Sequence, residues 1–492
     1  MAQDNTFQII IDNFEGLAPA YYSNDWSVYG NKGSANDLKD VDISDPNVLT
    51  QGASTSPLTS GTQAGSVSTL ISSIMKGAVS NDTTFAVGGN KVYKISNTVV
   101  ASTGGFPATI DKDGVTGETA TDIVYYKDYL YAFYNHSGSA GDVAKITPGS
   151  GTVDATWGSV TGGGTLTDTP HYAIVAGNDM VGFTDGTYVR TIDGTTFGYD
   201  LDLPTNSQAD TITWNGDYFL IGVNRPNVSG ANYNQSAIYF WDGYATSWNV
   251  PPVPVSGKIG ALFTHNGTTY VWWKDNNGVG GCNFGYLNGS VLTVIERYDG
   301  SLPNQSQVSD YYGFITWVSN DEIFIWGAGD NKTQVKFFKY LTAPHKTVGS
   351  IASPFGSLLI SSTGDVGEVP VTQYYLSKES GISSNSYWKT IVYNLMSPYG
   401  IAVVNNIKIL TEEIEEGALL DTKIVYNQGQ EEKQLTQILG ASTGNKVHHI
   451  ILNTAIPLID FRLELEWGSA TKPVKIRNIY ISGIYMNKNG TI

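Results

Sequence analysis

The sequence that decides the fold is Thr211-Ile-Thr-Trp-Asn-Gly-Asp-Tyr-Phe-Leu-Ile-Gly-Val223. Two short runs of β-branched and aromatic residues lie on either side of an Asn-Gly-Asp turn, and runs of this kind bounded by turn residues are typical of strands. An Asn-Gly pair readily adopts the left-handed dihedral angles that tight hairpin turns require. The stretch therefore predicts a β-hairpin.

The same pattern recurs along the middle of the chain. Hairpins of this kind start at residues 85, 122, 172, 211, 259, 312 and 350, at steps of 37 to 53 residues. A four-stranded propeller blade takes about 40–50 residues. Both runs of each hairpin are apolar, as expected where blades pack face to face around an axis. We therefore predict an all-β protein with a β-propeller of about seven blades over residues 66–384.

Composition supports an all-β protein and excludes two other classes. Aromatic residues make up 12% of the chain, charged residues only 15%, and 55 of the 492 residues are glycine. A disordered chain has few aromatic residues. A coiled coil or helical repeat needs a charge-rich helical period. Neither class fits this sequence.

Residues 1–65 differ from the repeats, because a regular strand pattern is present only at Phe7–Ile11. An irregular stretch of this length is too long for a loop inside a compact domain, and its aromatic residues are unlike a disordered tail. We predict either an extended arm along this protein or a neighbour, or the strand that closes the propeller. Candidate assembly contacts in this segment are Phe14, Tyr21, Tyr22 and Trp26.

The last segment, residues 385–492, reads as strands that alternate cleanly. In the run from Phe461 to Trp467, the apolar residues Phe461, Leu463, Leu465 and Trp467 share one face, and Arg462, Glu464 and Glu466 share the other. Such alternation marks a sheet that is packed on one side only. We predict an antiparallel β-sandwich or jelly-roll-like domain here.

Charge argues against sequence-specific nucleic-acid binding. The net charge is −17, and the densest basic stretch, Lys472 to Arg477, holds three positive charges. Nucleic-acid binders usually carry a basic face or stripe. Cys282 is the only cysteine, so no intramolecular disulfide is possible. The first residues lack the basic region of a signal peptide, and no apolar stretch approaches the ~20 residues of a membrane span.

Motifs that would carry chemistry are missing, so we expect no catalytic, cofactor-binding or metal site. His448 and His449 are adjacent, so on a strand they point to opposite faces and cannot share a metal. The acidic stretch from Asp111 to Glu118 lacks the glycine spacing of a calcium loop and is better explained as a turn. Asp122, Asp217 and Glu322 could serve a glycosidase, but each also fits a hairpin turn or edge.

Two short motifs at the ends of the chain suggest a family. Ile11-Asp-Asn-Phe-Glu-Gly-Leu17 opens the irregular lead-in, and Val474-Lys-Ile-Arg-Asn-Ile-Tyr-Ile-Ser-Gly483 ends the last domain. With a divergent propeller between them, the chain resembles tailed-bacteriophage virion propellers of the tail-hub, nozzle or packaged-DNA-stabilisation type. The resemblance covers the whole chain in its order of parts.

This resemblance implies a non-enzymatic structural protein of the virion tail or neck, made in the host cytoplasm. Its implied partners are portal, adaptor or tail proteins and further copies of itself in a ring, and DNA would pass an acidic lumen without being bound. Two alternatives remain: a receptor- or glycan-binding propeller and a glycan hydrolase. For the first, Trp272-Trp273 or Tyr311-Tyr312 could be stacking platforms, although a place in the blade core fits their strand positions better.

Overall fold

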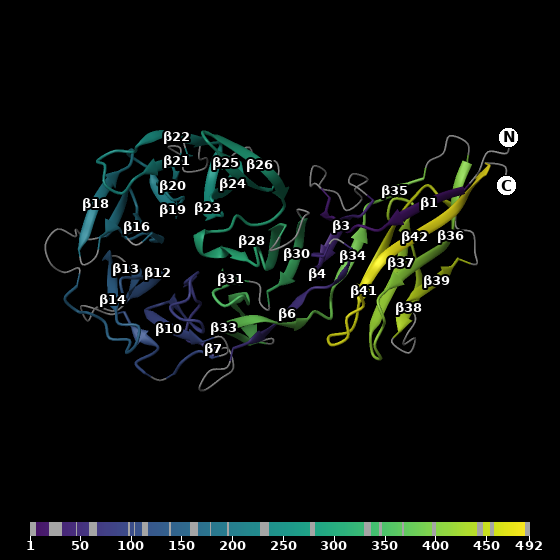
Figure 1. Cartoon of the computed structure of the whole chain (residues 1–492), viewed down its shortest axis with the longest axis horizontal. Helices are drawn as coiled ribbons and strands as arrows, with labels where there is room; N and C mark the ends of the chain where they lie inside the picture. The colour runs from purple at the N-terminus through teal and green to yellow at the C-terminus, as the bar shows by residue number, and fades with distance from the viewer. Residues whose placement is uncertain are drawn as a thin grey trace. The chain divides into compact units, whose positions relative to one another are not determined.

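The computed structural model describes residues 6–18, 32–45, 47–58, 66–96, 99–102, 104–110, 117–136, 139–157, 166–177, 179–193, 196–226, 236–275, 281–328, 336–343, 347–366, 369–395, 400–439, 446–452 and 457–487. The protein is all-β: among these residues every regular element is a strand, except one 3-10 turn at Gln305–Gln307. The chain divides into two compact units (Figure 1). Unit 1 contains residues 1–55, 322–342 and 380–492, and unit 2 contains residues 56–321 and 343–379.

Unit 2 consists of small antiparallel sheets, built mainly from strands that follow one another in the chain. The sheets are β8 (Ser73–Ile74), β9 (Thr83–Gly88), β10 (Lys91–Ser96) and β11 (Ala108–Thr109); β12 (Glu118–Tyr126), β13 (Tyr129–His136) and β14 (Ser139–Ile146); β15 (Ala173–Ala176), β16 (Met180–Asp185), β17 (Tyr188–Ile192) and β18 (Phe197–Asp202); β19 (Gln208–Trp214), β20 (Phe219–Asn224), β21 (Ser236–Trp241) and β22 (Val250–Val255); β23 (Gly257–His265), β24 (Thr268–Asp275), β25 (Cys282–Asn288) and β26 (Val291–Tyr298); β27 (Val308–Tyr311) and β28 (Phe314–Ser319); and β31 (Thr347–Ala352), β32 (Leu359–Val366) and β33 (Val369–Ile382).

The sheets of unit 2 follow one another around a closed circle (Figure 1). The first strand of each sheet contacts the first strand of the next, in the order β8, β12, β15, β19, β23, β27 and β31, and β31 contacts β8 again. Because each sheet has a neighbour on both sides, both of its faces are covered. This explains why strands such as β16, β20 and β28 are buried at every residue.

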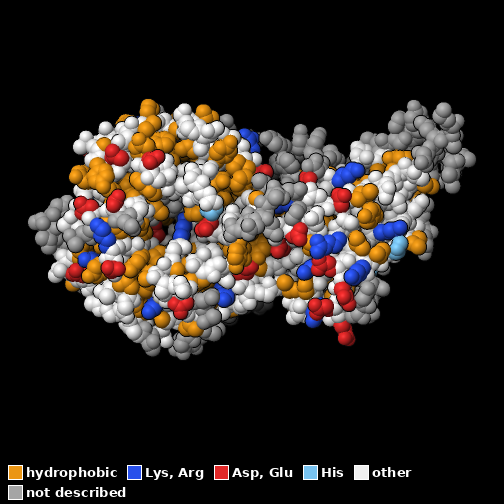
Figure 2. Space-filling model, in the orientation of Figure 1, with side chains coloured by type: hydrophobic (Ala, Val, Ile, Leu, Met, Phe, Trp, Pro, Cys, Tyr) orange, Lys and Arg blue, Asp and Glu red, His pale blue; other side chains and the backbone are white. Residues whose placement is uncertain are grey.

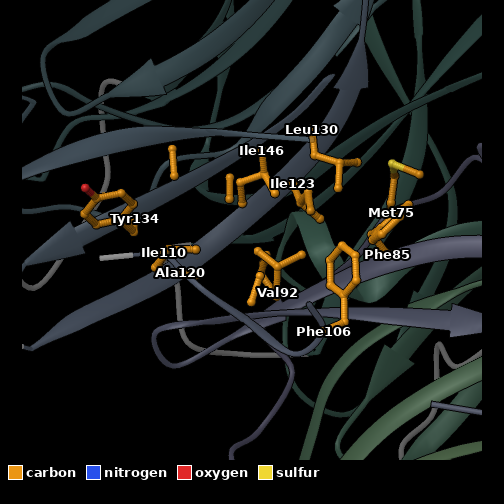
Figure 3. Close-up of a cluster of buried hydrophobic side chains, with 14 residues drawn as sticks. Met75, Phe85, Val92, Phe106, Ile110, Ala120, Ile123, Leu130, Tyr134 and Ile146 are labelled. Atoms are coloured by element: carbon orange, nitrogen blue, oxygen red, sulfur yellow. The ribbon is translucent and has the colours of Figure 1, made fainter. Parts of the chain in front are cut away.

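Apolar side chains fill the spaces between neighbouring sheets. Figure 3 shows one such cluster, in which Phe85 and Val92 from one sheet meet Ile123 and Leu130 from the next. The Phe85 ring also lies 5.4 Å from the ring of Phe106. Face-to-face packing of this kind buries the inner strands, whereas the last strands of the sheets, such as β18 and β26, remain partly exposed.

The hairpins expected from the sequence are strands of these sheets, with two shifts in position. Five of them are the first and second strands of their sheets. The stretch 85–95 corresponds to β9 with β10, and the stretch 312–326 covers β28 and then β29 (Glu322–Gly327), which belongs to unit 1. The true first strands there are β8, with two residues, and β27, with the sequence Val-Ser-Asp-Tyr. Neither contains the apolar run by which the other first strands were recognised.

Residues near the N-terminus close the last sheet of unit 2. β7 (Ser66–Val67) pairs antiparallel with Tyr374 and Tyr375 of β33, and the Leu58 N–H donates to the Leu376 carbonyl. Leu58 belongs to the lead-in of residues 1–65, whereas β7 directly follows it.

Unit 1 contains two larger sheets. The first has the order β1 (Thr6–Ile11), β42 (Ile476–Asn487), β36 (Gly400–Thr411) and β39 (Val447–Ile451), with β40 (Pro457–Leu458) also on β36. The second contains β29, β30 (Lys336–Thr342), β2 (Gly16–Leu17), β3 (Ser34–Lys39), β34 (Tyr387–Thr390), β41 (Asp460–Trp467), β37 (Leu419–Tyr426) and β38 (Glu431–Leu439) in this order, with β35 (Tyr393–Asn394) also on β41. Pairing is antiparallel except that β2 runs parallel to β3 and β30.

Several described strands of the lead-in, β1, β2 and β3, belong to these two sheets. All six residues of β1 pair with β42, from Thr6 with Ile484 to Ile11 with Ile479. β3, with the sequence Ser-Ala-Asn-Asp-Leu-Lys, pairs with β34. Its polar residues hid this strand from a search for apolar alternation. These strands form because they pair with strands far away in the chain, and the local sequence does not indicate such pairing.

The alternation in β41 predicts that its charged face lies in solvent, and this prediction is wrong for two residues. The apolar face is buried as expected, but Arg462 and Glu464 on the other face are also buried, with 7% and 3% exposure. β41 lies between β34 and β37, and its charges are compensated within the unit. Arg462 pairs with Glu464 at 2.7 Å, and Lys423 pairs with Glu464 at 3.0 Å. The charges of this strand can therefore be buried, because each has a partner of opposite charge. In a sheet packed on one side only, they would lie in solvent.

Candidate functional site

A polar pocket lies in unit 2 where the first strands of two sheets begin and their second strands end. The pocket has a volume of about 670 Å³. We call it the strand-end pocket; its lining residues are Pro170, Tyr172, Gln208, Asp210, Asn224, Pro226, Lys258, Ile259, Gly260, Lys274, Asp275, Leu302, Pro303 and Asn304. Polar side chains gather here because strands that are buried on both faces reach solvent only at their ends.

A β-bulge places Asp210 in this pocket. The register of β19 against β20 shifts between Ala209 and Thr211, so Asp210 is the extra residue. Bulges redirect a side chain away from the regular pleat. β23 carries a matching bulge between Ile259 and Ala261, and its extra residue, Gly260, also lines the pocket.

Asn224 holds the Asp210 carboxylate in place. Its side-chain amide donates to Asp210 Oδ2 at 2.7 Å and to the Ile259 carbonyl at 2.7 Å. The Asn224 Oδ1 atom accepts from the Ile259 N–H at 2.8 Å. One amide therefore joins the end of β20 to the beginning of β23 and orients the carboxylate between them.

The charges of the strand-end pocket nearly balance. Asp210 and Asp275 oppose Lys258 and Lys274. Burial raises the pKa of Asp210, while the Asn224 hydrogen bond and the Lys258 charge act in the opposite direction. Burial, followed by the charges of Asp122 and Asp210, raises the pKa of Tyr172. The pocket thus offers many hydrogen-bonding groups without a strong net charge.

A smaller cavity of about 250 Å³ lies among the first strands, and we call it the inner cavity. Asp122 lines it and accepts three hydrogen bonds, from Ser73 Oγ at 2.6 Å, the Ala173 N–H at 2.8 Å and the Ile123 N–H at 2.9 Å. These donors belong to three successive sheets, so this carboxylate ties the sheets together. Burial raises the pKa of Asp122.

Lys76 also lines the inner cavity. Its Nζ atom donates to the Gln305 carbonyl at 3.2 Å and lies 4.9 Å from the centre of the Phe263 ring. Burial lowers the pKa of Lys76 to about 8, although the charges of Asp122 and Asp310 act against the shift. The sequence gave no indication of this lysine, because it comes from a turn next to the two-residue strand β8.

The acidic residues that the sequence suggested for a glycosidase do not form a single site. Asp122 holds sheets together, and Asp217 is exposed in the turn between β19 and β20. Glu322 belongs to unit 1, where it pairs with Lys339 at 3.1 Å. Asp210, one residue before the stretch that decides the fold, was missed because a bulge cannot be recognised from one strand alone.

The proposed stacking platforms belong mostly to the core. Trp272 is fully buried, and Trp273 and Tyr311 are 4% and 7% exposed, whereas Tyr312 is 57% exposed. The core interpretation is therefore correct for three of the four aromatic residues.

Of the candidate assembly contacts, the structure describes Phe14. Its side chain is fully buried in unit 1, and its ring lies 5.7 Å from the Trp388 ring in an edge-to-face arrangement. Tyr21, Tyr22 and Trp26 lie outside the described residues.

Within the described ranges, no group of three or more His, Cys, Asp or Glu side chains could hold a metal ion. The stretch 111–116 lies outside these ranges. Cys282 is buried, and this burial raises the pKa of its thiol. The described part of the chain has no helix long and apolar enough to span a membrane. Figure 2 shows acidic and basic side chains scattered over the visible face of unit 2.

Neither a protein-family model nor a curated protein matches this sequence. Among solved structures, the chain is similar to the computationally designed Ika8 protein at 9% identity and a TM-score of 0.39, covering 66% of this chain and 99% of that one. It is similar to an exo-β-1,3-galactanase from Phanerochaete chrysosporium at 10% identity and a TM-score of 0.30, covering 80% and 99%. A third is the extracellular domain of a putative hybrid two-component system from B. thetaiotaomicron, at 11% identity and a TM-score of 0.45, covering 89% and 60%. None of the three is a phage tail protein, and TM-scores this low carry no argument about function.

Proposed function

We propose that this protein binds a neutral, hydroxyl-rich ligand, such as an oligosaccharide, in the strand-end pocket. The observation that carries the proposal is the lining of the pocket: two carboxylates, two ammonium groups and three side-chain amides converge there. Carboxylates accept hydrogen bonds from hydroxyl groups, ammonium groups donate to them, and amides do both. Because the charges nearly balance, a neutral ligand fits better than an ion.

The architecture that we infer for the site is a propeller. The circle of contacts among first strands supports seven blades in unit 2, within the range 66–384 expected from the repeats. The two sheets of unit 1 support a β-sandwich that includes residues 385–492. In propellers the ends of the inner strands surround the axis, so a pocket at this place collects side chains from several blades.

We infer binding without catalysis as the simplest use of two acids that are both held in place as hydrogen-bond acceptors. Asp210 accepts from Asn224. Asp275 accepts from Ser256 Oγ at 3.0 Å and from Trp273 Nε1 at 3.2 Å. Carboxylates that are held in this way are suited to orienting hydroxyl groups. A glycosidase needs one carboxyl group to act as an acid and a second to act as a base or nucleophile.

The test is a screen of the full chain on an array of neutral and charged glycans, followed by calorimetry with the best ligand. We expect Asp210→Ala and Lys258→Ala to weaken binding by at least about tenfold, since hydrogen bonds to charged groups contribute about 1.5–3 kcal/mol. The matched control is Asp217→Asn, in the exposed turn of the same hairpin, which should bind as the native protein does.

Three outcomes would contradict this proposal. The first is the absence of any glycan ligand, and the second is binding that survives both pocket substitutions in correctly folded protein. The third is the appearance of shortened sugars during incubation, which would make the protein a glycan hydrolase.

We keep a role in a phage tail as a second proposal. It rests on the net charge of −17, which suits a surface that DNA passes without being held. In this proposal the protein is a ring component in the virion, in contact with portal, adaptor or tail proteins. Electron microscopy of the purified protein with a portal ring is the test: co-assembly supports the proposal, and a monomer that ignores the portal contradicts it.

A further inference from the structure

Two half-exposed tyrosines from neighbouring sheets of unit 2 lie against each other. Tyr199 on β18 is 48% exposed, and Tyr244, which follows β21, is 52% exposed. Their ring centres are 5.4 Å apart and their planes meet at 67°. We call them the tyrosine pair. Most large aromatic side chains of unit 2 are buried between sheets, whereas about half of the surface of each of these two residues is exposed to solvent.

The ring of Tyr244 is presented by a fixed turn. Asp242 Oδ1 accepts from the N–H groups of Tyr244 and Ala245, both at 2.9 Å. Asn249 donates its side-chain amide to Asp242 Oδ2 at 2.8 Å, and Trp241 Nε1 donates to the Ala245 carbonyl at 2.7 Å. A ligand that binds to this ring therefore does not bear the entropy cost of ordering the turn.

Tyr199 is held in a similar way from the neighbouring sheet. Its N–H donates to Thr191 Oγ1 at 2.8 Å, at the place where the pairing of β17 with β18 is irregular. The two rings thus come from separate sheets, and the backbone beneath each ring is fixed. Such preorganisation lowers the entropy cost of binding.

Two carboxylates and one ammonium group lie near the tyrosine pair, which leaves a net negative charge there. Burial raises the pKa of Tyr244, and the charges of Asp179 and Asp193 add to this shift. Lys127 stands near the same carboxylates, and its ammonium group lies 5.0 Å from the centre of the Tyr126 ring. The protein therefore already places one cation over a tyrosine in this region. Within the described residues, the lysines and arginines that lie over aromatic rings lie over rings other than Tyr199 and Tyr244.

The tyrosine pair is at the opposite end of the sheet from the strand-end pocket. β19 begins at the pocket and β20 returns to it, ending at Asn224. β21 is antiparallel to β20, and Phe219 at the beginning of β20 pairs with Trp241 at the end of β21. Tyr244 follows Trp241 by three residues, so a ligand at the tyrosine pair is independent of a ligand in the pocket.

We propose that the tyrosine pair, with Asp179 and Asp193, binds a quaternary ammonium group such as the trimethylammonium head of choline. The faces of tyrosine rings attract cations, and the two carboxylates add a negative potential. A quaternary ammonium has no N–H to donate, so it needs aromatic faces and negative charge and not a set of hydrogen-bond acceptors. This site is additional to the strand-end pocket and does not depend on a glycan ligand.

The test is a titration of the full chain with choline, followed by NMR of the protein. Choline should bind saturably, and its uncharged isostere 3,3-dimethylbutan-1-ol should bind more weakly, because it has the same shape without the charge. Tyr199→Ala and Tyr244→Ala should each weaken binding by about 2- to 30-fold, the range expected for a cation over an aromatic ring. Tyr244→Phe should retain binding, since the ring face is kept.

A matched control is Tyr312→Ala, which removes an exposed tyrosine from another sheet and should leave choline binding unchanged. The combined change Asp179→Asn with Asp193→Asn should weaken binding and reduce its dependence on salt. Vesicles of phosphatidylcholine, compared with vesicles of phosphatidylglycerol, distinguish a choline headgroup on a membrane from free choline. Equal binding of the uncharged isostere, an equal loss in Tyr312→Ala, or no saturable binding of choline in any form would overturn the proposal.

Discussion

β20 in unit 2 and β39 in unit 1 show how differently the two units use a strand. Every residue of β20, Phe219–Asn224, is buried. In β39, Val447–Ile451, only Ile450 is buried, and Ile451 is 68% exposed. A strand covered on both faces has no side chain left for a ligand except at its ends. This explains why the strand-end pocket lies at the ends of inner strands, and why the tyrosine pair lies on the exposed last strand β18 and in the turn after β21. In unit 1 the edge strand β39 is largely exposed.

The largest expected effect comes from truncating one apolar side chain in each of these strands. Phe219→Ala should lower the free energy of unfolding by about 3–5 kcal/mol, because it leaves a cavity between two sheets. Ile451→Ala should change it by less than about 0.5 kcal/mol, since that side chain is already in solvent. Urea unfolding of both variants gives the comparison. Equal effects would mean that the two strands are not buried differently.

A smaller effect should follow from adding one methyl group where two sheets of unit 2 meet. A Cβ on Gly182 would collide with the ring of Phe219, whereas a Cβ on Gly77 would meet nothing within 4 Å. We expect Gly182→Ala to cost about 1–3 kcal/mol through overpacking and Gly77→Ala to be nearly neutral. Thermal unfolding of both variants checks this. A tolerated Gly182→Ala would show that the sheets can move apart more easily than their close packing suggests.

The partly buried charge of Lys76 should make the stability of unit 2 depend on pH. Its pKa of about 8 in the folded protein lies below the ordinary value of about 10.4, so the folded state binds fewer protons between these limits. The free energy of unfolding should therefore rise as the pH increases from 8 to about 10, by at most about 1.4 kcal/mol per pH unit. Below pH 8 the cost of the buried charge is fully present.

The measurement is urea unfolding of the native protein and of Lys76→Met across this pH interval. The difference between the two proteins isolates this lysine from the other groups that titrate there. A difference that stays constant with pH would show that Lys76 is solvated as an ordinary surface lysine.

The smallest effect is expected for a partly exposed charge network in unit 1. Asp37 pairs with Lys389 at 3.0 Å and with Lys339 at 3.7 Å, and it accepts from the Tyr387 hydroxyl at 2.9 Å. Because water still reaches these groups, Asp37→Asn should cost only about 0–1 kcal/mol, and less at high salt. Unfolding at two salt concentrations tests this. A larger, salt-independent loss would place Asp37 with the buried charges.

The sequence was informative where a strand carries an apolar run. It located five hairpins in their sheets and the strand from Phe461 to Trp467. It was uninformative for β8 and β3, which are short or polar, because such strands are specified by pairing partners that lie far away in the chain. The burial of Arg462 and Glu464 was missed for the same reason: alternation shows which residues share a face, but it does not show what covers that face.

The amino-acid sequence by itself determined that this protein is all-β, where many of its hairpins turn, and that its net charge is acidic. The first two properties depend on dihedral preferences and on a period of two residues, so a few neighbouring positions determine them. The net charge is a sum over the whole chain and does not depend on the fold. Tertiary structure alone decided which side chains meet. Asp210 enters the strand-end pocket through a bulge, Asp122 joins three sheets, and Tyr199 meets Tyr244 from the next sheet. Each contact joins residues that are distant in the chain, and only the packing of whole sheets brings them together.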